Sequence, residues 1–341
     1  MKAARFHEHG PPAVIRYEDA PDPVPPPGHA QVRVRACALN HLDLWQRRGI
    51  DRVRIPLPHI SGSDVAGDVI DPGNSALQAG ARVMLQPGLS CGICPACREG
   101  RDNLCPSYDV LGLLSDGGYA ELVTVPAVNL VPIPDHVSYV EAAAFPLTFL
   151  TAWHMLVTLA RVREGETVLV LAGGSGVGQA AIQIARLLGA RVLATSSASK
   201  IDRTRALGAE AVFDHYEGDY AHDVKALTSG RGADVVVEHV GQATWDRSLR
   251  SLARGGRLVT CGATTGPKAA IDLRHLFARQ LSLLGSYMGT KPELLAAAPS
   301  FFEGKLRPAI DRVLPLREAA AAHERLEQAE QFGKIVLATD L

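Results

Sequence analysis

The sequence of 341 residues has no excess of charge of either sign. Its 35 lysines and arginines are balanced by 36 aspartates and glutamates, so the formal net charge is −1. No block of five or more like charges occurs in the chain. Proteins that bind duplex nucleic acid or an anionic membrane surface usually carry such clustered charge. We therefore expect neither of these partners, and a small-molecule substrate instead.

The sequence also lacks the features of an exported or membrane-anchored protein. The first ten residues contain no apolar core of a secretory signal, so we expect a cytoplasmic location. The stretch 142–160 has no Asp, Glu, Lys or Arg and is long enough to cross a bilayer. It contains Pro146, His154 and three threonines, which favour a buried helix between domains over a membrane span.

Internal repeats and low-complexity segments are absent too, and 47% of the residues are hydrophobic. A chain of this length and composition forms about two globular domains. Up to residue 128, short strands alternate with turns rich in proline and glycine, such as 25–28 and 71–73. Residues 31–36 alternate polar and apolar side chains, which is typical of a strand with one buried face. This half of the chain resembles an antiparallel barrel.

From residue 165 the pattern changes to apolar runs that alternate with helical stretches, which predicts βαβ units around a parallel sheet. The predicted strands are 167–171, 191–195, 234–238, 257–261 and, near the C-terminus, 334–337. The predicted helices are 179–188, 200–207, 243–253 and 316–330. A doubly wound sheet binds its ligand at the carboxyl ends of its strands. Here these ends fall at 172–173, 195–196, 238–239 and 261–262, and we expect the final strand to return to the first domain.

Four of the six cysteines lie within fifteen residues, at Cys91, Cys94, Cys97 and Cys105. Thiolates at this spacing can share one tetrahedral zinc, and four sulfur ligands leave no open position for a substrate. We therefore expect one structural Zn²⁺. An iron–sulfur cluster or disulfides are the alternatives, but the last cysteine is too distant for the bacterial cluster pattern and a reducing compartment disfavours disulfides. Cys37 and Cys261 are expected to be free and buried.

A glycine-rich segment follows the first predicted strand of the second domain and precedes a helix. Its residues are Gly173, Gly174, Ser175, Gly176, Val177 and Gly178. Glycines at such a turn let the backbone approach a pyrophosphate, which the helix N-terminus then binds. The match to G-x-G-x-x-G is incomplete because Ser175 replaces the middle glycine. The position between strand and helix nevertheless predicts dinucleotide binding, and a turn without a ligand is the alternative.

The end of the second predicted strand indicates which nucleotide binds. An NAD site has an acidic residue there that binds the ribose hydroxyls and repels a 2′-phosphate. This chain has Ser196, Ser197 and Lys200 instead, with no acidic residue before Asp202. Hydroxyl donors and a cation suit a phosphate, so we expect NADPH. The alternative for Lys200 is that it merely lies on the following helix.

Over residues 32–337 these motifs resemble the medium-chain dehydrogenase/reductase superfamily in their order and spacing. The resemblance is carried by Cys-x2-Cys-x2-Cys-x7-Cys, by Ala-Gly-Gly-Ser-Gly-Val-Gly at 172–178, and by segments 232–238 and 333–337. It implies an α/β protein with a GroES-like β-barrel catalytic domain and a doubly wound Rossmann domain. The catalytic domain would span 1–128 and 285–341, with its zinc lobe at about 87–106, and the Rossmann domain would span 129–284.

The resemblance also shows where a catalytic zinc would bind in the zinc-type alcohol dehydrogenases of this superfamily. At the three ligand positions this chain has Asn40, the segment Ser63-Asp64 in place of His-Glu, and a segment near Leu147 without metal ligands. Three protein ligands are needed for a catalytic zinc. The pattern Asn40-x-x-Asp43 and segment 144–153 instead resemble the quinone oxidoreductase branch, which includes quinone, enone and enoyl-thioester reductases. His41, His59 and Asp64 remain as alternative ligands of a second metal.

The expected reaction is hydride transfer from NADPH to a conjugated carbonyl compound. Such an acceptor spreads negative charge over an enolate, which neutral donors can stabilise without a metal. The resemblance places the Asn40 amide and the Ser63 hydroxyl in that role, with Asp64 beside them and Asp43 orienting its neighbours. Turn residues that satisfy the backbone are the alternative for both donors. Trp45 and Tyr287 are expected to line the substrate pocket or to belong to the core.

The remaining expectations concern the cofactor and the assembly. We expect a homodimer or homotetramer. Two alternative functions remain open: a zinc-dependent alcohol dehydrogenase with altered ligands, and a nucleotide-binding protein without catalytic activity. In addition to the glycine-rich turn and its serine and lysine partners, the expected cofactor contacts are Thr151, His239, Val240, Gly262, Ser286, Met288 and Lys334.

Overall fold

The computed structural model describes all 341 residues and divides them into two compact units. The first unit comprises Met1–Leu147 and Thr290–Leu341, and the second comprises Thr148–Gly289. Two domains of this kind agree with the sequence, but the boundaries differ from the expected ones. Residues 129–147 belong to the first unit because β9 (Leu130–Pro132) pairs with a strand of its sheet.

Strand β3 (His29–Ala38) is the centre of the seven-stranded sheet of the first unit. It pairs antiparallel with β4 (Asp64–Asp71), β8 (Leu122–Pro126) and β17 (Lys334–Ala338). The alternation predicted for 31–36 is confirmed, because every second side chain of β3 is buried over this stretch. The order of the sheet is β16-β17-β3-β4-β5-β9, with β5 at Arg82–Leu85 and β16 at Ile310–Pro315.

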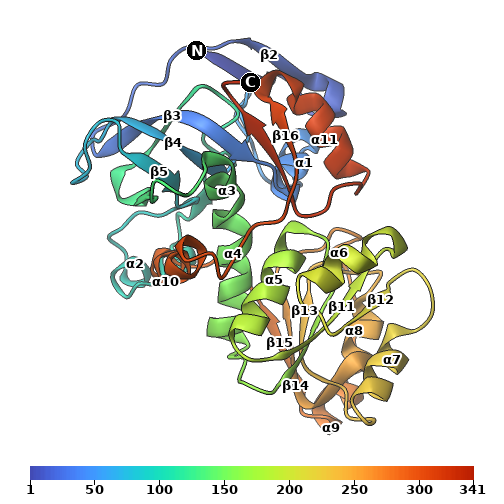
Figure 1. Cartoon of the computed structure of the whole chain (residues 1–341). Coiled ribbons are helices and arrows are strands. Elements are labelled where there is room, and N and C mark those ends of the chain that lie inside the picture. The colour runs from blue at the N-terminus through green and yellow to red at the C-terminus, as the bar shows by residue number, and fades with distance from the viewer. The chain divides into compact units, whose positions relative to one another are not determined.

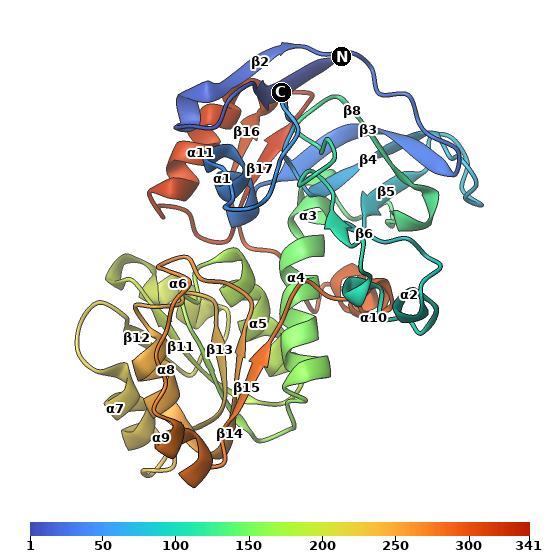
Figure 2. The same cartoon turned by 180° about the vertical axis from the view of Figure 1, so that it is seen from behind.

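The C-terminal segment returns to this sheet, as the sequence predicts. Antiparallel pairing sets Val336 of β17 opposite Ala38 of β3, and Leu337 opposite Cys37. Figure 2 labels β16 and β17, both in red, together with the blue β3 and β4 of the N-terminal half, and these four strands belong to one sheet.

Smaller elements complete the first unit. Two short antiparallel pairs are formed by β1 (Lys2–Phe6) with β2 (Ile15–Asp19) and by β6 (Gly88–Leu89) with β7 (Asp109–Val110). Its helices are α1 (His41–Arg48), α2 (Pro95–Arg98), α3 (Tyr139–Ala144), α10 (Lys291–Phe302) and α11 (Ala319–Glu327), and single 3-10 turns occur at Pro12–Val14, Asp102–Leu104, Ala127–Asn129 and Leu316–Glu318.

The second unit is built on six parallel strands in the order β12-β11-β10-β13-β14-β15. From β10 the chain adds β11 and β12 on one side, and it then crosses back so that β13 pairs with the other side of β10. This reversal creates the switch point at which doubly wound sheets bind ligands. The strands are β10 (Thr167–Val170), β11 (Arg191–Ser196), β12 (Ala211–Asp214), β13 (Ala233–Glu238), β14 (Leu252–Thr260) and β15 (Ser282–Gly285).

All four strands predicted for this unit are present, and β12 and β15 are additional. Both are only four residues long, and none of their residues is fully buried, so they lack the long apolar runs of the inner strands. Helices α5 (Gly176–Leu187) and α6 (Ile201–Ala206) cover one face of the sheet, and α7 (Tyr220–Leu227) and α8 (Trp245–Ser251) cover the other, as Figures 1 and 2 show. The last helix of this unit is α9 (Leu273–Ala278), and one 3-10 turn lies at Ala198–Lys200.

The uncharged stretch 142–160 is helical and largely buried, as expected. It includes the end of α3, then α4 (Pro146–Trp153) and a π-helical turn at His154–Leu159. Phe149 and Leu150 are fully buried. No helix of this protein combines the length and the apolar character needed to cross a bilayer.

Candidate functional site

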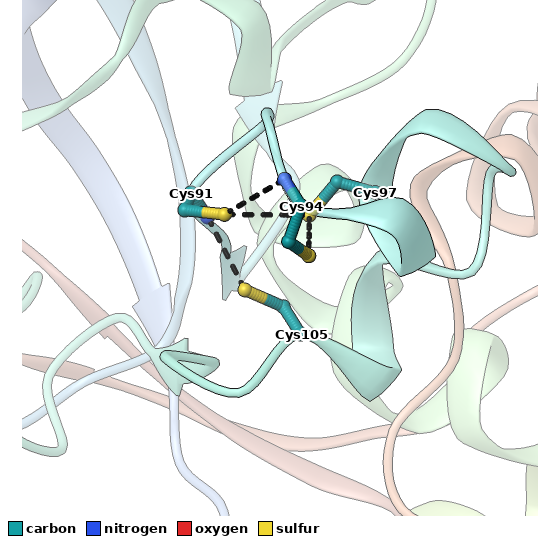
Figure 3. Close-up of side chains that lie close together, drawn as sticks. All are labelled: Cys91, Cys94, Cys97 and Cys105. Carbon is teal, nitrogen blue, oxygen red and sulfur yellow. Dashed lines mark hydrogen bonds between the residues drawn. The ribbon is translucent and has the colours of Figure 1, made fainter.

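The four clustered cysteines converge in a lobe between β6 and β7 (Figure 3). Their ligand atoms all lie within 4.8 Å of one another, with Sγ–Sγ distances of 3.5 Å between Cys94 and Cys97 and 4.0 Å between Cys91 and Cys97. Sulfurs bound to a tetrahedral zinc at about 2.3 Å lie about 3.8 Å apart, so the donor set fits this ion. All six cysteines of the chain are free of disulfides.

Local backbone geometry brings these sulfurs together. Gly92 and Gly100 have φ angles of 71° and 74°, which glycine adopts without strain. The amide of Cys94 donates to Cys91 Sγ at 3.4 Å, and the amide of Cys91 donates to Cys105 Sγ at 3.5 Å. The second contact lowers the pKa of the Cys105 thiol to about 6, which favours the thiolate that a metal requires.

A second group of polar residues is buried where β3 ends and α1 begins. Asn40 is the N-cap of α1, and its backbone amide donates to Asp43 Oδ2 at 2.8 Å. The hydroxyl of Tyr119 donates to the same oxygen at 2.7 Å. Burial raises the pKa of Asp43 to about 6, although both of these donors favour its charged form. Asp43 therefore fixes the turn that carries Asn40.

The side chain of Asn40 lies in a charged network. Its Nδ2 donates to Asp64 Oδ2 at 2.9 Å, and its Oδ1 accepts a hydrogen bond of 2.6 Å from Lys334 Nζ. Lys334 also forms a salt bridge of 2.9 Å with Asp64 Oδ2. The other oxygen of Asp64 accepts the backbone amide of Leu147 at 2.7 Å. We refer to Asn40, Asp64 and Lys334 as the amide triad.

The other residues predicted for this site do not all contact the amide triad. Ser63 is fully buried, and its hydroxyl has no hydrogen-bond partner. His59 Nε2 contacts the carbonyl oxygen of Gly112 at 2.8 Å, and burial lowers the pKa of this imidazole. The ring of His41 lies 6.5 Å from that of Trp45. In the whole chain, only the four cysteines form a group of three or more His, Cys, Asp or Glu side chains close enough to share an ion.

The glycine-rich turn of the second unit follows β10 and begins α5. Ser175 caps the helix by accepting the amide of Gly178 at 2.9 Å. A Cβ at Gly178 would lie 2.3 Å from the carbonyl oxygen of Ala172, and one at Gly173 would lie 2.6 Å from Thr204 Cγ2. Both positions therefore require glycine. Because the first amides of α5 have no partner within the helix, the turn presents donors suited to a pyrophosphate.

The loop after β13 is fixed by a carboxylate inside the protein. Glu238 is fully buried and accepts the amides of Val240 at 2.7 Å and Gly241 at 3.0 Å. It also accepts the hydroxyls of Thr244 at 2.9 Å and Ser248 at 2.5 Å. This acid therefore shapes the loop that carries His239 and Val240.

Basic groups gather beyond the end of β11. Ser196 is buried, and Lys200 closes the 3-10 turn that follows this strand. Burial is the main cause that lowers the pKa of His215, and the charges of Arg247 and Lys200 lower it further. Arg247 also donates to the carbonyl oxygen of His215 at 3.1 Å. His215 follows β12 and Arg247 lies on α8, so neither residue could be linked to the end of β11 from the sequence.

One acidic residue also lies in this region. Asp214 ends β12 and is the register partner of Ser196, and its carboxylate accepts the amide of Tyr216 at 2.8 Å. The charges that act on His215 are therefore those of two cations, Lys200 and Arg247, and one carboxylate, Asp214.

The remaining predicted cofactor contacts have different environments. Thr151 and Met288 are buried, and Gly262 and Ser286 follow the ends of β14 and β15. The hydroxyl of Ser286 is buried without a partner. The expected pocket residue Tyr287 is 56% exposed. Lys334, which was also expected to bind the cofactor, places its ammonium group against Asn40 and Asp64.

Comparison with known proteins gives two matching family models. The alcohol dehydrogenase GroES-like domain matches residues 26–135, and the zinc-binding dehydrogenase domain matches residues 176–303. The quinone oxidoreductase of Pseudomonas aeruginosa is 32% identical to this chain over 349 residues, covering 98% of this chain and 99% of the relative.

Two solved structures share the fold over nearly the whole chain. One, described as an NAD-dependent alcohol dehydrogenase, is 46% identical with a TM-score of 0.96 and covers 99% of this chain and 100% of its own. The other, a crotonyl-CoA carboxylase/reductase in complex with NADP, is 25% identical with a TM-score of 0.93 and covers 99% of this chain and 94% of its own.

Proposed function

Because the chain belongs to the medium-chain dehydrogenase/reductase superfamily of oxidoreductases, we propose that it reduces a conjugated carbonyl compound with NADPH and without a catalytic zinc. The acceptor class comprises quinones, enones and enoyl thioesters. Relatives described as quinone oxidoreductase and crotonyl-CoA carboxylase/reductase support such acceptors. The four-cysteine lobe would hold one structural zinc.

The amide triad is the observation that carries this proposal. A catalytic zinc needs three protein ligands and one open position. Around Asn40, both oxygens of Asp64 already accept hydrogen bonds, and a lysine ammonium lies against Asp64 and Asn40. A cation held by the protein in this way would repel a metal ion. The donor set is therefore better suited to binding a carbonyl oxygen than to binding zinc.

The reaction places specific demands on these side chains. When bound, NADPH would supply a hydride to the β-carbon of the acceptor, which leaves negative charge on the carbonyl oxygen until a proton from water completes the reduction. One hydrogen of the Asn40 amide is donated to Asp64, and the second has no partner within the protein. We assign this second hydrogen to the developing enolate oxygen. A donor placed in this way acts mainly in the transition state.

The residues for cofactor binding fit a phosphorylated dinucleotide. The turn at 173–178 would hold the pyrophosphate with its backbone amides. Ser196, Ser197 and Lys200 would hold the 2′-phosphate, with Arg247 contributing a second positive charge close to His215. His239, Val240, Gly262, Thr151, Ser286 and Met288 are proposed to contact the rest of the nucleotide.

NAD-dependent alcohol oxidation is the second candidate function. The structural relative at 46% identity carries that description, and Asp214 next to Ser196 supplies a carboxylate of the kind that binds ribose hydroxyls. We favour NADPH because β11 itself ends in serines and because two cations, Lys200 and Arg247, act on His215 beside this acid. A simple alcohol, moreover, forms no delocalised enolate, so its alkoxide would need stronger stabilisation than the neutral Asn40 donor supplies.

One set of assays separates these functions. The zinc-loaded protein would be tested for oxidation of NADPH and NADH with a quinone, an enone and an enoyl-CoA ester, and for reduction of NAD and NADP by ethanol and benzyl alcohol. We expect NADPH-dependent reduction of a conjugated acceptor that persists after chelation sparing the structural zinc. Alcohol oxidation that is lost on such chelation would contradict the proposal and favour the second function.

The role of Asn40 has its own test. Asn40→Ala should lower kcat by about 10²- to 10³-fold with a much smaller change in KM, because it removes a transition-state donor. Asn74→Ala, at an exposed asparagine in the turn after β4, is the matched control and should leave kcat unchanged. Normal turnover by Asn40→Ala would show that the donor lies elsewhere.

We also propose that the chain forms a homodimer through the edge of the second unit. Strand β15 is the last strand of its sheet, so one row of its backbone groups has no neighbouring strand. Large apolar side chains are exposed next to this edge: Leu283 is 37% exposed, Leu273 64% and Phe277 69%. A second copy that adds its own β15 would cover both features.

A further inference from the structure

Strand register places Lys334 directly opposite Asn40. β17 and β3 run antiparallel, with Val336 paired to Ala38 and Leu337 paired to Cys37. Two residues further along this register, Lys334 faces Asn40. On the other side of β3, Ala38 is paired with Asp64 of β4. The three members of the amide triad therefore come from three adjacent strand ends, with Asn40 in the middle.

The chemistry of its two partners fixes the orientation of the Asn40 amide. A lysine ammonium has donors only, so it must face the oxygen Oδ1. An ionised aspartate has acceptors only, so it must face the nitrogen Nδ2. The contacts agree with both requirements, at 2.6 Å from Lys334 Nζ to Oδ1 and 2.9 Å from Nδ2 to Asp64 Oδ2. A rotation of the amide by 180° would set donor against donor and acceptor against acceptor.

The surroundings make this arrangement rigid. Lys334 is 2% exposed, Asp64 is fully buried and Asn40 is 6% exposed. Gly333 allows the chain to enter β17 here, since it has a φ of 78° and a Cβ would lie 2.1 Å from the carbonyl oxygen of Ala309. The amide of Lys334 donates to that same carbonyl at 2.8 Å. The backbone on both sides of the triad is thus held in place.

The stability of the fold does not by itself account for this lysine. A buried ion pair costs desolvation free energy that its attraction often only offsets, and apolar residues of similar volume frequently replace such pairs without loss of stability. The pair does have a specific effect on Asn40. A cation on the amide oxygen polarises the group and strengthens its N–H donors, because hydrogen bonds in a chain reinforce one another.

We propose that Lys334 is a positioning residue for the reduction: it fixes the orientation of the Asn40 amide and strengthens the one amide hydrogen that remains for the substrate oxygen. This inference rests on the proposed function, in which Asn40 is the donor to the enolate. It gives the lysine of segment 333–337 a role in the chemistry, in place of the cofactor contact expected from the sequence. Lys334 itself does not touch the substrate in this mechanism.

A double-mutant cycle on kcat tests the proposal. The variants are Lys334→Met, Asn40→Ala and the two combined, assayed with the zinc-loaded protein, NADPH and whichever conjugated acceptor the wild type reduces. Lys334→Met alone should lower kcat by about ten- to a hundredfold, as expected for a misplaced catalytic group. In the Asn40→Ala background, the same substitution should change kcat by less than about twofold, because no amide is left to position.

Two further variants guard against simple misfolding. Lys334→Met leaves the buried Asp64 carboxylate without its cation. The double variant Lys334→Met/Asp64→Asn removes both charges. It should still lower kcat, because the Asn40 amide can then adopt either orientation. Lys334→Arg keeps a cationic donor and should recover part of the lost kcat. The thermal midpoint and the Kd for NADPH should stay near wild type in the charge-neutral double variant.

The outcomes separate this inference from the proposed function. Full activity of Asn40→Ala would overturn the donor assignment and this inference with it. A slow Asn40→Ala combined with a normal kcat for Lys334→Met would overturn the positioning role alone. Effects of the two substitutions that multiply in the double variant would likewise show that Lys334 acts independently of Asn40.

Discussion

The hydroxyl of Ser175 lies 2.9 Å from Nε2 of His239, and this contact joins the glycine-rich turn to the end of β13. The Ser175 oxygen also accepts the amide of Gly178. Burial lowers the pKa of His239 to about 4, which keeps the ring neutral at pH 7. The two loops at the switch point are thus held together by one serine.

Ser175→Ala should destabilise the protein and weaken nucleotide binding together. Loss of an N-cap costs about 1 kcal/mol of the free energy of unfolding, and the turn would lose its link to His239. Ser138→Ala is the control, because Ser138 caps α3 in the first unit in the same way. It should reduce stability by a similar amount and leave the Kd for NADPH unchanged. Urea unfolding and NADPH fluorescence titration measure the two effects, and equal Kd values for both variants would contradict the link.

Cys94→Ser should reduce bound zinc from one equivalent to near zero and lower the thermal midpoint. The lobe depends on the ion because its exposed turns bury little apolar surface. Cys261→Ser is the control, since this cysteine lies outside the lobe. Metal analysis by mass spectrometry with parallel thermal unfolding checks the prediction. Full zinc content in Cys94→Ser would refute a site formed by four thiolates.

Lys200→Glu should weaken NADPH binding by roughly ten- to a hundredfold and NADH binding much less. A charge-assisted contact to phosphate is worth about 1.5–3 kcal/mol, and the new carboxylate also repels the 2′-phosphate. Lys225→Glu on α7 introduces the same charge change elsewhere in the second unit and should affect neither nucleotide. Titration with both cofactors measures the two affinities. An equal loss of affinity for NADPH and NADH would contradict the assignment of Lys200 to the 2′-phosphate.

His323→Gln should make the protein less sensitive to acid. Burial, with Arg47 next to it, lowers the pKa of His323 to about 3, whereas an unfolded histidine titrates near pH 6.5. Between these values the unfolded chain binds one more proton, so stability falls as the pH drops below 6.5. Removing this titration should reduce the loss of stability between pH 7 and pH 5 by roughly 2 kcal/mol. Urea unfolding at both pH values tests this, and an unchanged difference would contradict it.

Phe277→Glu should convert the proposed homodimer to monomers. The substitution places a charge among the apolar side chains next to β15, where a second copy would bury it. Leu187→Glu, at a 41% exposed leucine of α5, is the control and should leave the assembly intact. Sedimentation analysis distinguishes the two states. A dimer that persists in Phe277→Glu would place the interface on another surface.

Local patterns were sufficient for much of this structure. Four strands of the second unit were predictable because each is a run of buried apolar residues between turns, and the cysteine lobe was predictable because metal ligands repeat at short spacing. Residues 129–147 were expected in the Rossmann domain but belong to the first unit. Their place depends on the pairing of β9 with β5, which lie some 45 residues apart in the sequence. The short strands β12 and β15 were not predicted, because their apolar runs are too short to be recognised as strands in the sequence.

The sequence by itself determined the fold class, the clustering of the four cysteines and the glycine-rich turn, since each depends on residues close together in the chain. Tertiary structure alone decided what surrounds Asn40. Lys334 lies 294 residues from Asn40 and reaches it only because β17 pairs with β3, and Asp64 arrives from β4 on the other side. A lysine in a short C-terminal motif carries no local sign of its partner. Lys334 becomes a neighbour of the Asn40 amide only through hydrogen bonding between β17 and β3, two strands that lie far apart in the sequence.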